Sequence, residues 1–563
     1  MYHKHTLLRL TSTFIISLML TNCGGGGSDD SVTATPTGTP ASTTNTATED
    51  TIYDLSYKGL TFYHKDMPPS EYQLNQVSND EFNAFSEQKK LQVANKLLST
   101  LFFGYPLKTL ENKINSGSFI NDIHSGFTED KTDKAWLEDY IVNEDIFRQV
   151  SYNEQVAVDI LSRFFAMEEL DSYFIKNWMA YILTQTIMFS PAYELDSTST
   201  PNIARVYNRL VSMLNSESGM RYIGYVHMMS EDNWRRFRSP EDNGREMLEI
   251  FTLDEDDSHV PIAGQALKNW KLDRDNDTLV VSLNQNTEAL TLFGTTIYNG
   301  DDFYRELVKS NLYTKGVSSR LVEFFFPNET ESQKTDILNA LIASKPETWK
   351  DILIQIVFSE AYLLHSEQAK SAEELFFPMA KRMYFKHQTR TLHNLKYALD
   401  EMHQATMRYK LGKLERVPLD TLSFANYHRF IREQLMLKNS NPTKINDYTA
   451  YDRHGWDESF VDNTNFTFDG ENVVESLTSF IHYLFKATIM RNASTEELAL
   501  FKTHMLIGTV GDQILRNEFN MFRTDDDPVR QREQREIRKK RIATVVLDYI
   551  SRLEETYTQQ KVK

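Results

Sequence analysis

Arg245 and Glu246 are the first residues whose types and spacing could do chemistry. Arg245 stands four residues after Glu241 and four before Glu249, so on a helix these three side chains share one face. Glu246 points about a quarter-turn away from that face. Two interpretations stay open: a structural network of ion pairs, or a polar site in which Arg245 and Glu246 contact a ligand.

Two acidic segments that follow could attract a hard cation. The first precedes a histidine, and the second spaces three carboxylates as calcium loops do. The second departs from a calcium loop because Thr278 and Asn284 stand where such loops carry a glycine and a glutamate. Both segments could equally be solvated acidic loops. The candidate metal ligands are Asp254, Asp256, His259, Asp273, Asp275 and Asp277.

A polar and aromatic stretch from Asn439 to Glu471 holds a further candidate. His454, with Asp452 and Asp457 on either side, could line a polar pocket or lie in a surface turn. The stretch is too long for an ordinary connection, so we expect a functional loop or a disordered insert. The usual motifs of nucleotide binding, serine hydrolysis, zinc proteolysis and haem attachment do not occur in the sequence. The pattern therefore identifies no cofactor and leaves open whether the protein is an enzyme.

The elements that must position these residues are mainly helices. From residue 51 onward glycine and proline are scarce, and apolar residues recur with the helical period. We predict a mainly α protein: a large multi-helix bundle with a small β-hairpin and one long irregular loop, 439–471. The hairpin is expected to pair Thr278–Leu283 with Leu290–Phe293. The predicted domains are a helical core domain at 51–390 and a C-terminal helical region at 391–563.

Cys23, the sole cysteine of the chain, lies where a lipoprotein would need it. A short basic start precedes an apolar stretch from Leu10 to Leu20, which is too short to span a bilayer and suits the core of a secretory signal. Leu20-Thr21-Asn22-Cys23 resembles the motif at which lipoprotein signals are cleaved, although Asn22 departs from the usual small residue. We predict a signal peptide at 1–22 and lipidation of Cys23. The alternative is a free cysteine in a core.

Residues 23–50 predict a lipidated, flexible tether. They are rich in Gly, Ser, Thr and Pro and hold no aromatic residue, so they cannot bury enough surface to offset their ordering entropy. Gly24 resembles the residue that directs lipoproteins to the outer membrane, where the body would face the periplasm or the exterior. The net charge of −18 argues against a nucleic-acid partner. The expected membrane contact is the lipid anchor.

The segment from Ser239 to Leu253 carries the most specific pattern. Ser239 and Pro240 indicate a helix start, and the letters N-G-R-E-M-L-E-I-F-T-L follow, with G-Q-A-L-K-N-W further on. This pattern resembles the signature of the large bacterial family known as domain of unknown function 1800. Other stretches resemble motifs of the same family, in the same order: Leu97–Gly104, Phe293–Gly294, Asp302, Arg320–Phe325, Phe358–Tyr362 and Gly455–Trp456.

The resemblance implies a fold and a partner protein but no reaction, because the family has no established activity. Its members are often exported and often encoded beside a sulfatase-like protein, which is the partner that the resemblance implies. This chain departs from the family at Gln285-Asn286, where a His-Asp pair is usual. Gln-Asn can only hydrogen-bond, whereas His-Asp could bind a metal or transfer a proton.

Three functions follow from the sequence. The first is a non-catalytic scaffold or partner-binding subunit of the cell envelope, held at the outer membrane by its lipid. The second is a periplasmic or surface enzyme of hydrolase-like type, with Arg245, Glu246 and His454 as candidate catalytic residues. The third is a cation- or glycan-binding protein.

Overall fold

The fold is that of a computed structural model, which describes the chain in separate ranges. All of the described residues belong to the compact unit formed by Thr44–Lys563. Cys23, the tether, Asp277, His454 and the stretch 439–471 lie outside them. The described ranges are 73–138, 150–188, 202–237, 239–254, 256–275, 278–385, 392, 395–399, 421–432, 473–504, 527–529, 542–543 and 545–562.

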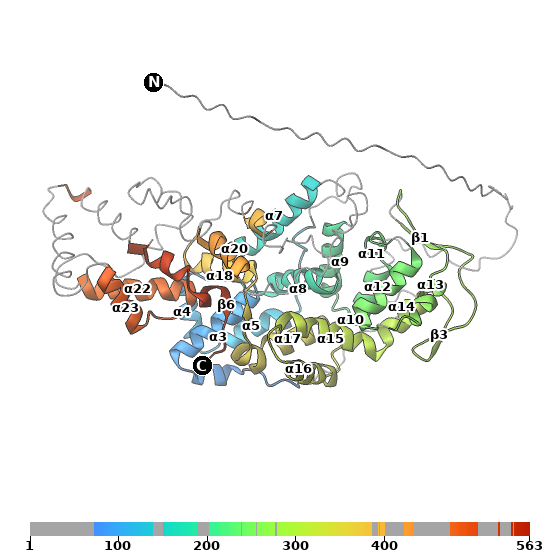
Figure 1. The fold of residues 1–563 in the computed structure, drawn as a ribbon, viewed down its shortest axis with the longest axis horizontal. Coiled ribbons are helices and arrows are strands. Elements are labelled where there is room, and N and C mark those ends of the chain that lie inside the picture. Colours follow the sequence, from blue (N-terminus) through green and yellow to red (C-terminus); the bar gives the residue numbers. More distant parts are fainter. Residues whose placement is uncertain are drawn as a thin grey trace, which may run out of the picture. The chain divides into compact units, whose positions relative to one another are not determined.

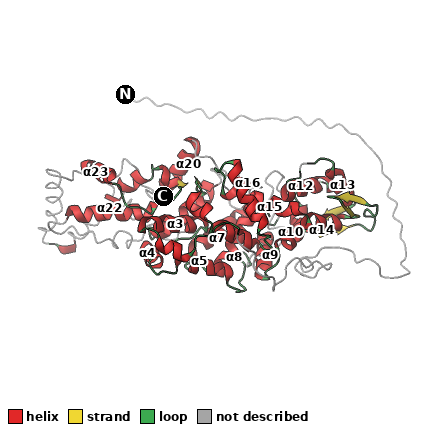
Figure 2. Cartoon of the chain, turned by 90° about the horizontal axis from the view of Figure 1, so that it is seen from below, coloured by secondary structure: helices red, strands yellow, loops and turns green. Residues whose placement is uncertain are grey.

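Helices dominate the described residues (Figure 2), which confirms the prediction of a mainly α fold. The N-terminal helices start at side-chain caps: Ser78, Ser86 and Asp171 each accept a backbone N–H of the first turn. The helices of this part are α2 (Asn79–Ala84), α3 (Glu87–Thr100), α4 (Leu107–Ile114), α5 (Phe119–Thr128), α7 (Val150–Ala166), α8 (Ser172–Thr186), α9 (Ile203–Asn215), α10 (Met220–Met229) and α11 (Glu231–Trp234).

The middle of the chain combines helices with two small hairpins (Figure 1). The helix predicted to start at Ser239 does so: the Ser239 hydroxyl accepts the N–H of Asp242 at 3.1 Å, and Pro240 occupies the first turn. The elements are α12 (Pro240–Thr252), α13 (His259–Ala266), β1 (Trp270–Asp273), β2 (Thr278–Val281), β3 (Leu290–Leu292), β4 (Thr295–Ile297), α14 (Gly300–Lys309), α15 (Asn311–Phe325), α16 (Glu331–Ala343) and α17 (Trp349–Val357).

The hairpin prediction was right about where two strands lie and wrong about their pairing. β2 pairs backward with β1, with Asp273 opposite Thr278, whereas β3 pairs forward with β4. The reason lies in the turns. Phe293 and Gly294 both adopt positive φ, at 50° and 81°, which closes a tight two-residue hairpin between β3 and β4. The residues between β2 and β3 form an irregular connection instead.

The C-terminal end of the chain joins its middle through a short sheet. β5 pairs antiparallel with β6, and the N–H of Lys370 donates to the carbonyl of Tyr557 at 2.8 Å. The predicted domain boundary at residue 390 stays a prediction, although described elements from both sides of it are in contact. These elements are η3 (Ala361–His365), β5 (Gln368–Ala369), α18 (Ala372–Arg382), α20 (Thr421–Ile431), α22 (Val473–Ile489), α23 (Thr495–His504), α26 (Glu554–Tyr557) and β6 (Thr558–Gln559).

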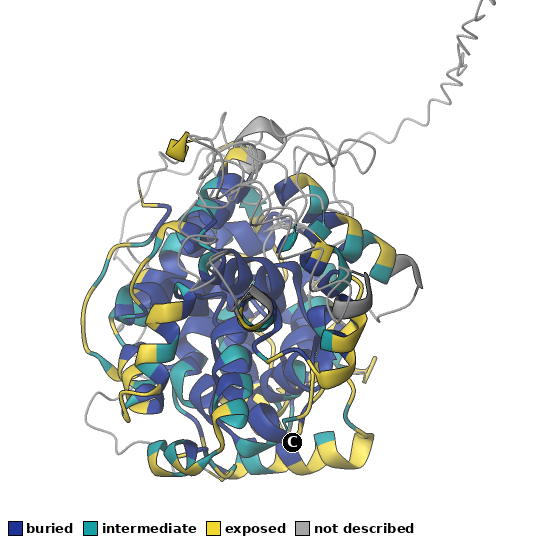
Figure 3. Cartoon of the chain, turned by 90° about the vertical axis from the view of Figure 1, so that its left-hand side faces the viewer, coloured by how far each residue is buried: buried dark blue, intermediate teal, exposed yellow. Residues whose placement is uncertain are grey.

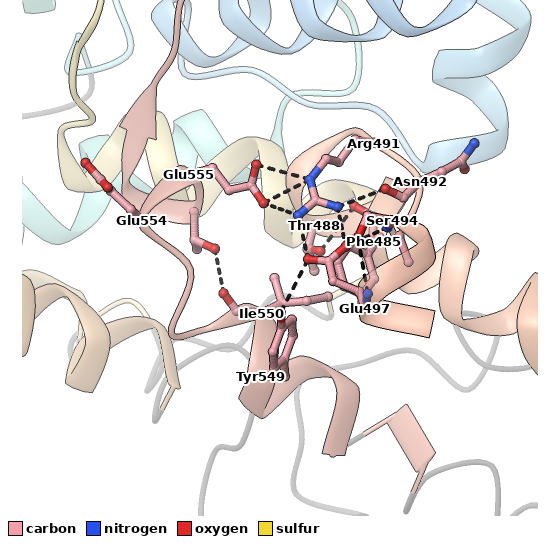
Figure 4. A network of polar contacts seen from close by, with 12 residues as sticks. Phe485, Thr488, Arg491, Asn492, Ser494, Glu497, Tyr549, Ile550, Glu554 and Glu555 are labelled. Atoms are coloured by element: carbon pink, nitrogen blue, oxygen red, sulfur yellow. Dashed lines mark hydrogen bonds and ion pairs between the residues drawn. The ribbon is translucent and has the colours of Figure 1, made fainter. Parts of the chain in front are cut away.

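Arg491 ties three of these C-terminal segments together (Figure 4). Its guanidinium donates to both carboxylate oxygens of Glu497, at 2.7 and 2.8 Å, and its Nε donates to Glu555 at 2.9 Å. The Tyr549 hydroxyl donates to Glu497 at 3.5 Å. Burial alone would raise the pKa of Glu497, but the hydrogen bond from Arg491 holds it below its ordinary value. The pair therefore stays charged at neutral pH and fixes the approach to β6.

The core runs through the described residues and surrounds α8. Every residue of α8 except Tyr173 is buried, including the large side chains Trp178 and Tyr181. Figure 3 shows buried segments at the centre and exposed ones along the outer helices. A helix that is buried all round belongs to the interior of a large packed bundle. Among the described helices, none is long and apolar enough to cross a membrane.

Close packing between α12 and α15 gives a first testable prediction. A β-carbon added at Gly316 would lie 2.4 Å from the carbonyl oxygen of Phe251. We expect Gly316→Ala to lower the free energy of unfolding by about 1–2 kcal/mol, since overpacking outweighs the gain in helix propensity. Urea denaturation measures this, with exposed Asn339→Ala on α16 as the control. Equal stability of Gly316→Ala and the parent protein would contradict the close approach.

Lys96, which is buried between α3 and η3, gives a second prediction. Its Nζ donates to the carbonyl of Ser366 at 2.6 Å, and burial lowers its pKa from 10.5 to about 7. Between these pH values the unfolded chain binds more protons than the folded one, so stability rises with pH. Relative to Lys96→Met, the free energy of unfolding of the parent protein should rise by about 1 kcal/mol per pH unit between roughly pH 7.5 and 9.5.

The control for this pH series is Lys90→Met, because Lys90 lies on the same helix and is partly exposed. The free energy of unfolding of Lys90→Met, plotted against pH, should run parallel to that of the parent protein. Parallel profiles for Lys96→Met and the parent would show that Lys96 does not change its protonation on unfolding in this range.

Candidate functional site

A cleft of about 670 Å³ opens beside the start of α4, within the size range of small-ligand sites. Its walls come from the α3–α4 junction, α5 and the residues after it, the turn before α8, and the last turn of α18. Carboxylates, lysines and aromatic rings share the lining. The lining residues are Gly104, Tyr105, Pro106, Thr109, Lys113, Phe119, Asp122, Ile123, Glu129, Lys131, Glu168, Glu169, Leu170, Asp171 and Lys381.

Gly104 sets the shape of the cleft wall. A β-carbon at this position would lie 2.7 Å from Cα of Pro378 and 2.9 Å from Cβ of Lys381, so a residue without a side chain is needed for α18 to approach. Phe103 is buried and packs edge-on against Tyr105, with ring centroids 4.9 Å apart. Phe103-Gly104 closes the first of the stretches that resemble the family.

Tyr105 is a lining residue whose hydroxyl pKa is shifted by burial and by nearby charges. Burial raises the pKa of its hydroxyl, and the carboxylates of Asp122 and Glu169 raise it further. A backbone hydrogen bond from Leu170 acts in the opposite direction. Lys113 holds its Nζ 4.8 Å from the centroid of the Tyr105 ring. The hydroxyl therefore stays protonated at neutral pH and can donate or accept a hydrogen bond.

Lys381, on α18, brings a second cation to the lining. Its Nζ lies 5.0 Å from the centroid of the Phe165 ring. Burial lowers the pKa of Lys381, and the carboxylate of Glu168 raises it. The cleft thus places lysines and carboxylates around buried aromatic surface. Such a lining can hold a ligand that carries both signs of charge.

Arg245 and Glu246, the sequence-predicted polar pair, lie on α12 and do not line this cleft. Arg245 is exposed, as are Glu241 and Glu249, and Glu246 is half-buried. The expected common face of Arg245, Glu241 and Glu249 is thus solvent-facing. Whether Arg245 and Glu246 contact a ligand stays a prediction.

The first acidic segment forms a histidine–carboxylate pair. His259 Nδ1 lies 2.6 Å from Asp254 Oδ2, and the His259 ring packs edge-on against Phe293. Hydrogen bonds from Ser258 lower the pKa of the exposed Asp256 carboxyl. Within the described ranges, no three His, Cys, Asp or Glu side chains come together as a group that could hold a metal.

The described carboxylates of the second acidic segment, Asp273 and Asp275, lie at the end of β1 and two residues beyond it. Asp273 Oδ1 accepts the N–H of Asp275 at 3.0 Å, a local turn contact. Asp277 lies outside the described residues, as do Cys23 and His454. The structure therefore gives the acidic residues that it describes turn and pairing roles, and cation binding by them stays a prediction.

Gln285 and Asn286, which stand where the resembled family usually has a His-Asp pair, hydrogen-bond within the fold. Trp270 Nε1 donates to Gln285 Oε1 at 3.4 Å, and Gln265 Nε2 donates to Asn286 Oδ1 at 3.0 Å. The Asn286 amide also donates to the carbonyl of Tyr298 at 2.6 Å. These side chains join α13, β1 and the second hairpin, which are the elements that carry the family-like motifs.

Sequence reasoning missed a buried ionic cluster between α9 and α11. Arg205 forms a bidentate pair with Asp232, at 2.8 and 2.7 Å, and Arg209 donates to Glu231 at 2.7 Å. All four side chains are buried. The available signal was the four-residue spacing of Arg205 and Arg209 on one helix face, followed by the Glu-Asp pair.

The charges of this cluster are set by burial and by each other. Burial alone would raise the pKa of Asp232, but the charge and hydrogen bonds of Arg205 hold it below its ordinary value. Burial raises the pKa of Glu231, which Arg209 opposes. Burial, together with nearby Arg236 and Arg209, lowers the pKa of His227 to about 3, so this histidine is neutral at physiological pH.

The cluster gives a third prediction. Asp232→Ala removes the bidentate partner of the buried Arg205 guanidinium and the acceptor of the Asn202 N–H. Glu231 is then the one carboxylate of the cluster for both Arg205, at 3.0 Å, and Arg209, at 2.7 Å. We expect the free energy of unfolding to fall by about 3–5 kcal/mol, because an uncompensated charge stays buried. Urea denaturation measures the change, with the exposed Glu241→Gln as the control. A loss below about 1 kcal/mol would show that the pair contributes no more than a surface ion pair.

Comparison of the chain with protein-family models, curated proteins and solved structures finds no match in any of the three.

Proposed function

We propose that this protein is a lipid-anchored, non-catalytic scaffold of the cell envelope that binds a partner. The observation that carries the proposal is the position of Cys23, directly after a signal-like segment and before a tether too polar to fold. Lipid on Cys23 would hold the helical body at the outer membrane, facing the periplasm or the exterior. We also propose that the chain is a member of the domain of unknown function 1800 family.

The polar side chains of the family-like motifs support a scaffold role over an enzyme. Gln285 and Asn286 form hydrogen bonds with Trp270, Gln265 and Tyr298, so these amides stabilise the fold. Arg245 is exposed on α12, away from the cleft. In this proposal the mixed-charge cleft is the site for the partner, and a sulfatase-like envelope protein is the partner that the family resemblance favours.

A second candidate function is binding of a glycan or another polar small ligand, and the cleft is the observation that favours it. Aromatic side chains and several carboxylates line the same space, and a mixed lining of this kind suits a polar small ligand. The two candidates differ in what occupies the cleft in the cell. A macromolecular partner changes the mass of the native particle, whereas a small ligand does not.

Native purification gives the fourth prediction. We expect the protein to come from the membrane of its own cells in mild detergent as a complex with a second protein in fixed ratio, and its N-terminal fragment to carry acyl chains on Cys23. Light scattering of the complex and mass spectrometry of that fragment measure both. The matched control is Cys23→Ser, whose N-terminal fragment should carry no acyl chain, because serine has no thiol to receive one.

Two results would contradict the proposal. An N-terminal fragment of the parent protein that carries no acyl chain on Cys23 would remove the lipid anchor from the proposal. A parent protein that leaves the membrane alone and monomeric would remove the partner, and the small-ligand function would then take its place.

A further inference from the structure

The cleft holds two lysines whose ammonium groups lie against rings. Lys113 lies over Tyr105 and Lys381 over Phe165, at 4.8 and 5.0 Å from the ring centroids. Within the part of the chain that the structure describes, neither lysine forms an ion pair with a carboxylate. Both can therefore receive an anionic group of a ligand without breaking an existing salt bridge.

The carboxylates of the lining divide into engaged and available groups. Asp171 caps α8 by accepting the N–H of Phe174, Asp122 accepts the Ser118 hydroxyl, and Glu129 pairs with Lys131. Glu168 and Glu169, in the turn before α8, have exposed side chains. Among the described residues they form no ion pair or side-chain hydrogen bond. These two carboxylates can receive a cationic group of a ligand.

Aromatic surface lies in the same lining as the two sets of charges. Tyr105 and Phe119 line the cleft and are buried, at 8% and 2% exposure. The exposed edges of these rings can contact aliphatic groups of a ligand. A ligand that matches this lining carries one anion, one cation and short apolar groups within about 670 Å³.

We infer that the cleft binds the carboxyl-terminal end of a peptide whose last residue is basic. The terminal carboxylate would meet Lys113 and Lys381, the basic side chain would meet Glu168 and Glu169, and the aliphatic portions would contact Tyr105 and Phe119. This inference rests on the proposed partner-binding function and names the segment that the partner presents. The same chemistry also fits a free short peptide, so the experiment must separate a protein tail from a free peptide.

The experiment, which is the fifth prediction, uses the mature full-length protein and four tripeptide probes in isothermal titration calorimetry. The probe Ac-Ala-Ala-Lys mimics a protein tail. Its amide, Ac-Ala-Ala-Lys-NH2, lacks the anion, and Ac-Ala-Ala-norleucine lacks the cation. We expect Ac-Ala-Ala-Lys to bind, and each of the two altered probes to bind about tenfold more weakly, because each loses one set of charge-assisted hydrogen bonds.

Matched variants assign each charge to its partner. In Glu168→Gln/Glu169→Gln the lysine probe should fall to the level of the norleucine probe, whose own binding should not change. In Lys113→Gln/Lys381→Gln the affinity for Ac-Ala-Ala-Lys should fall to that for its amide, and the affinity for the amide should not change. Glu331→Gln, an exposed substitution on α16, should bind like the parent protein. Thermal melting shows that each variant is folded.

The fourth probe, Ala-Ala-Lys with a free amino terminus, identifies the source of the ligand. A protein tail has no free amine at this place, so weaker or equal binding of this probe fits a tail, whereas clearly tighter binding fits a free peptide. No binding of Ac-Ala-Ala-Lys at about 5 mM would overturn the inference. Equal binding of all the probes, or binding that the cleft variants leave unchanged, would overturn it as well.

The outcome is separable from that of the proposed function. A partner recovered in fixed ratio from the membrane, together with failure of the peptides, overturns the peptide inference alone. Charge-specific peptide binding by a protein that leaves the membrane as a monomer overturns the scaffold proposal alone.

Discussion

The described fold depends on α8, because a helix without an exposed face must satisfy its polar groups from its neighbours. Asn177 accepts the N–H of Trp136 and the hydroxyl of Tyr207, both at 2.9 Å. Trp178 donates to the carbonyl of Thr100 at 3.0 Å, and Tyr181 donates to Glu373 at 2.5 Å. These bonds connect α8 with α3, α9 and α18. Because Asp171 caps α8, the connection that carries Glu168 and Glu169 is fixed to the start of this helix. The position of this cleft wall therefore depends on the packing of α8 in the core.

The parts of the fold that local sequence determines could be predicted. The start of α12 follows from Ser239 and Pro240, because a cap and its first turn involve neighbouring residues only. The strands near residues 280 and 290 were also visible in the sequence, but their pairing depends on which of the neighbouring connections is a tight turn. Phe293 adopts positive φ, which is uncommon for an aromatic residue, so the tight turn before Thr295 gave a weak signal. Pairing of β5 with β6 joins residues nearly two hundred positions apart, and no local pattern reports it.

The candidate site could not be predicted because its parts lie far apart in sequence. Lys113, Glu168 and Lys381 come from α4, the turn before α8 and α18, and none stands in a recognisable motif. The buried pair of Arg205 with Asp232 was hidden for another reason: two charges on neighbouring helices look like a solvated surface until their burial is known. Sequence reasoning instead favoured residues that are dense in local charge, such as Asp254 and Asp256, which the structure places in turns.

The family-like motifs lie mainly where two elements meet, and their side chains there make structural contacts. Gln265 and Asn286 join α13 to the second hairpin, and Gly104 allows α18 to approach the α3–α4 junction. The residue type matters at these positions for two reasons. A larger side chain at Gly104 would separate two elements, and an apolar side chain at Gln265 or Asn286 would leave a polar group without its hydrogen bond. Their constraint is therefore architectural. The groups that can meet a ligand, Glu168 and Lys381 among them, lie on the cleft walls that those contacts hold in place.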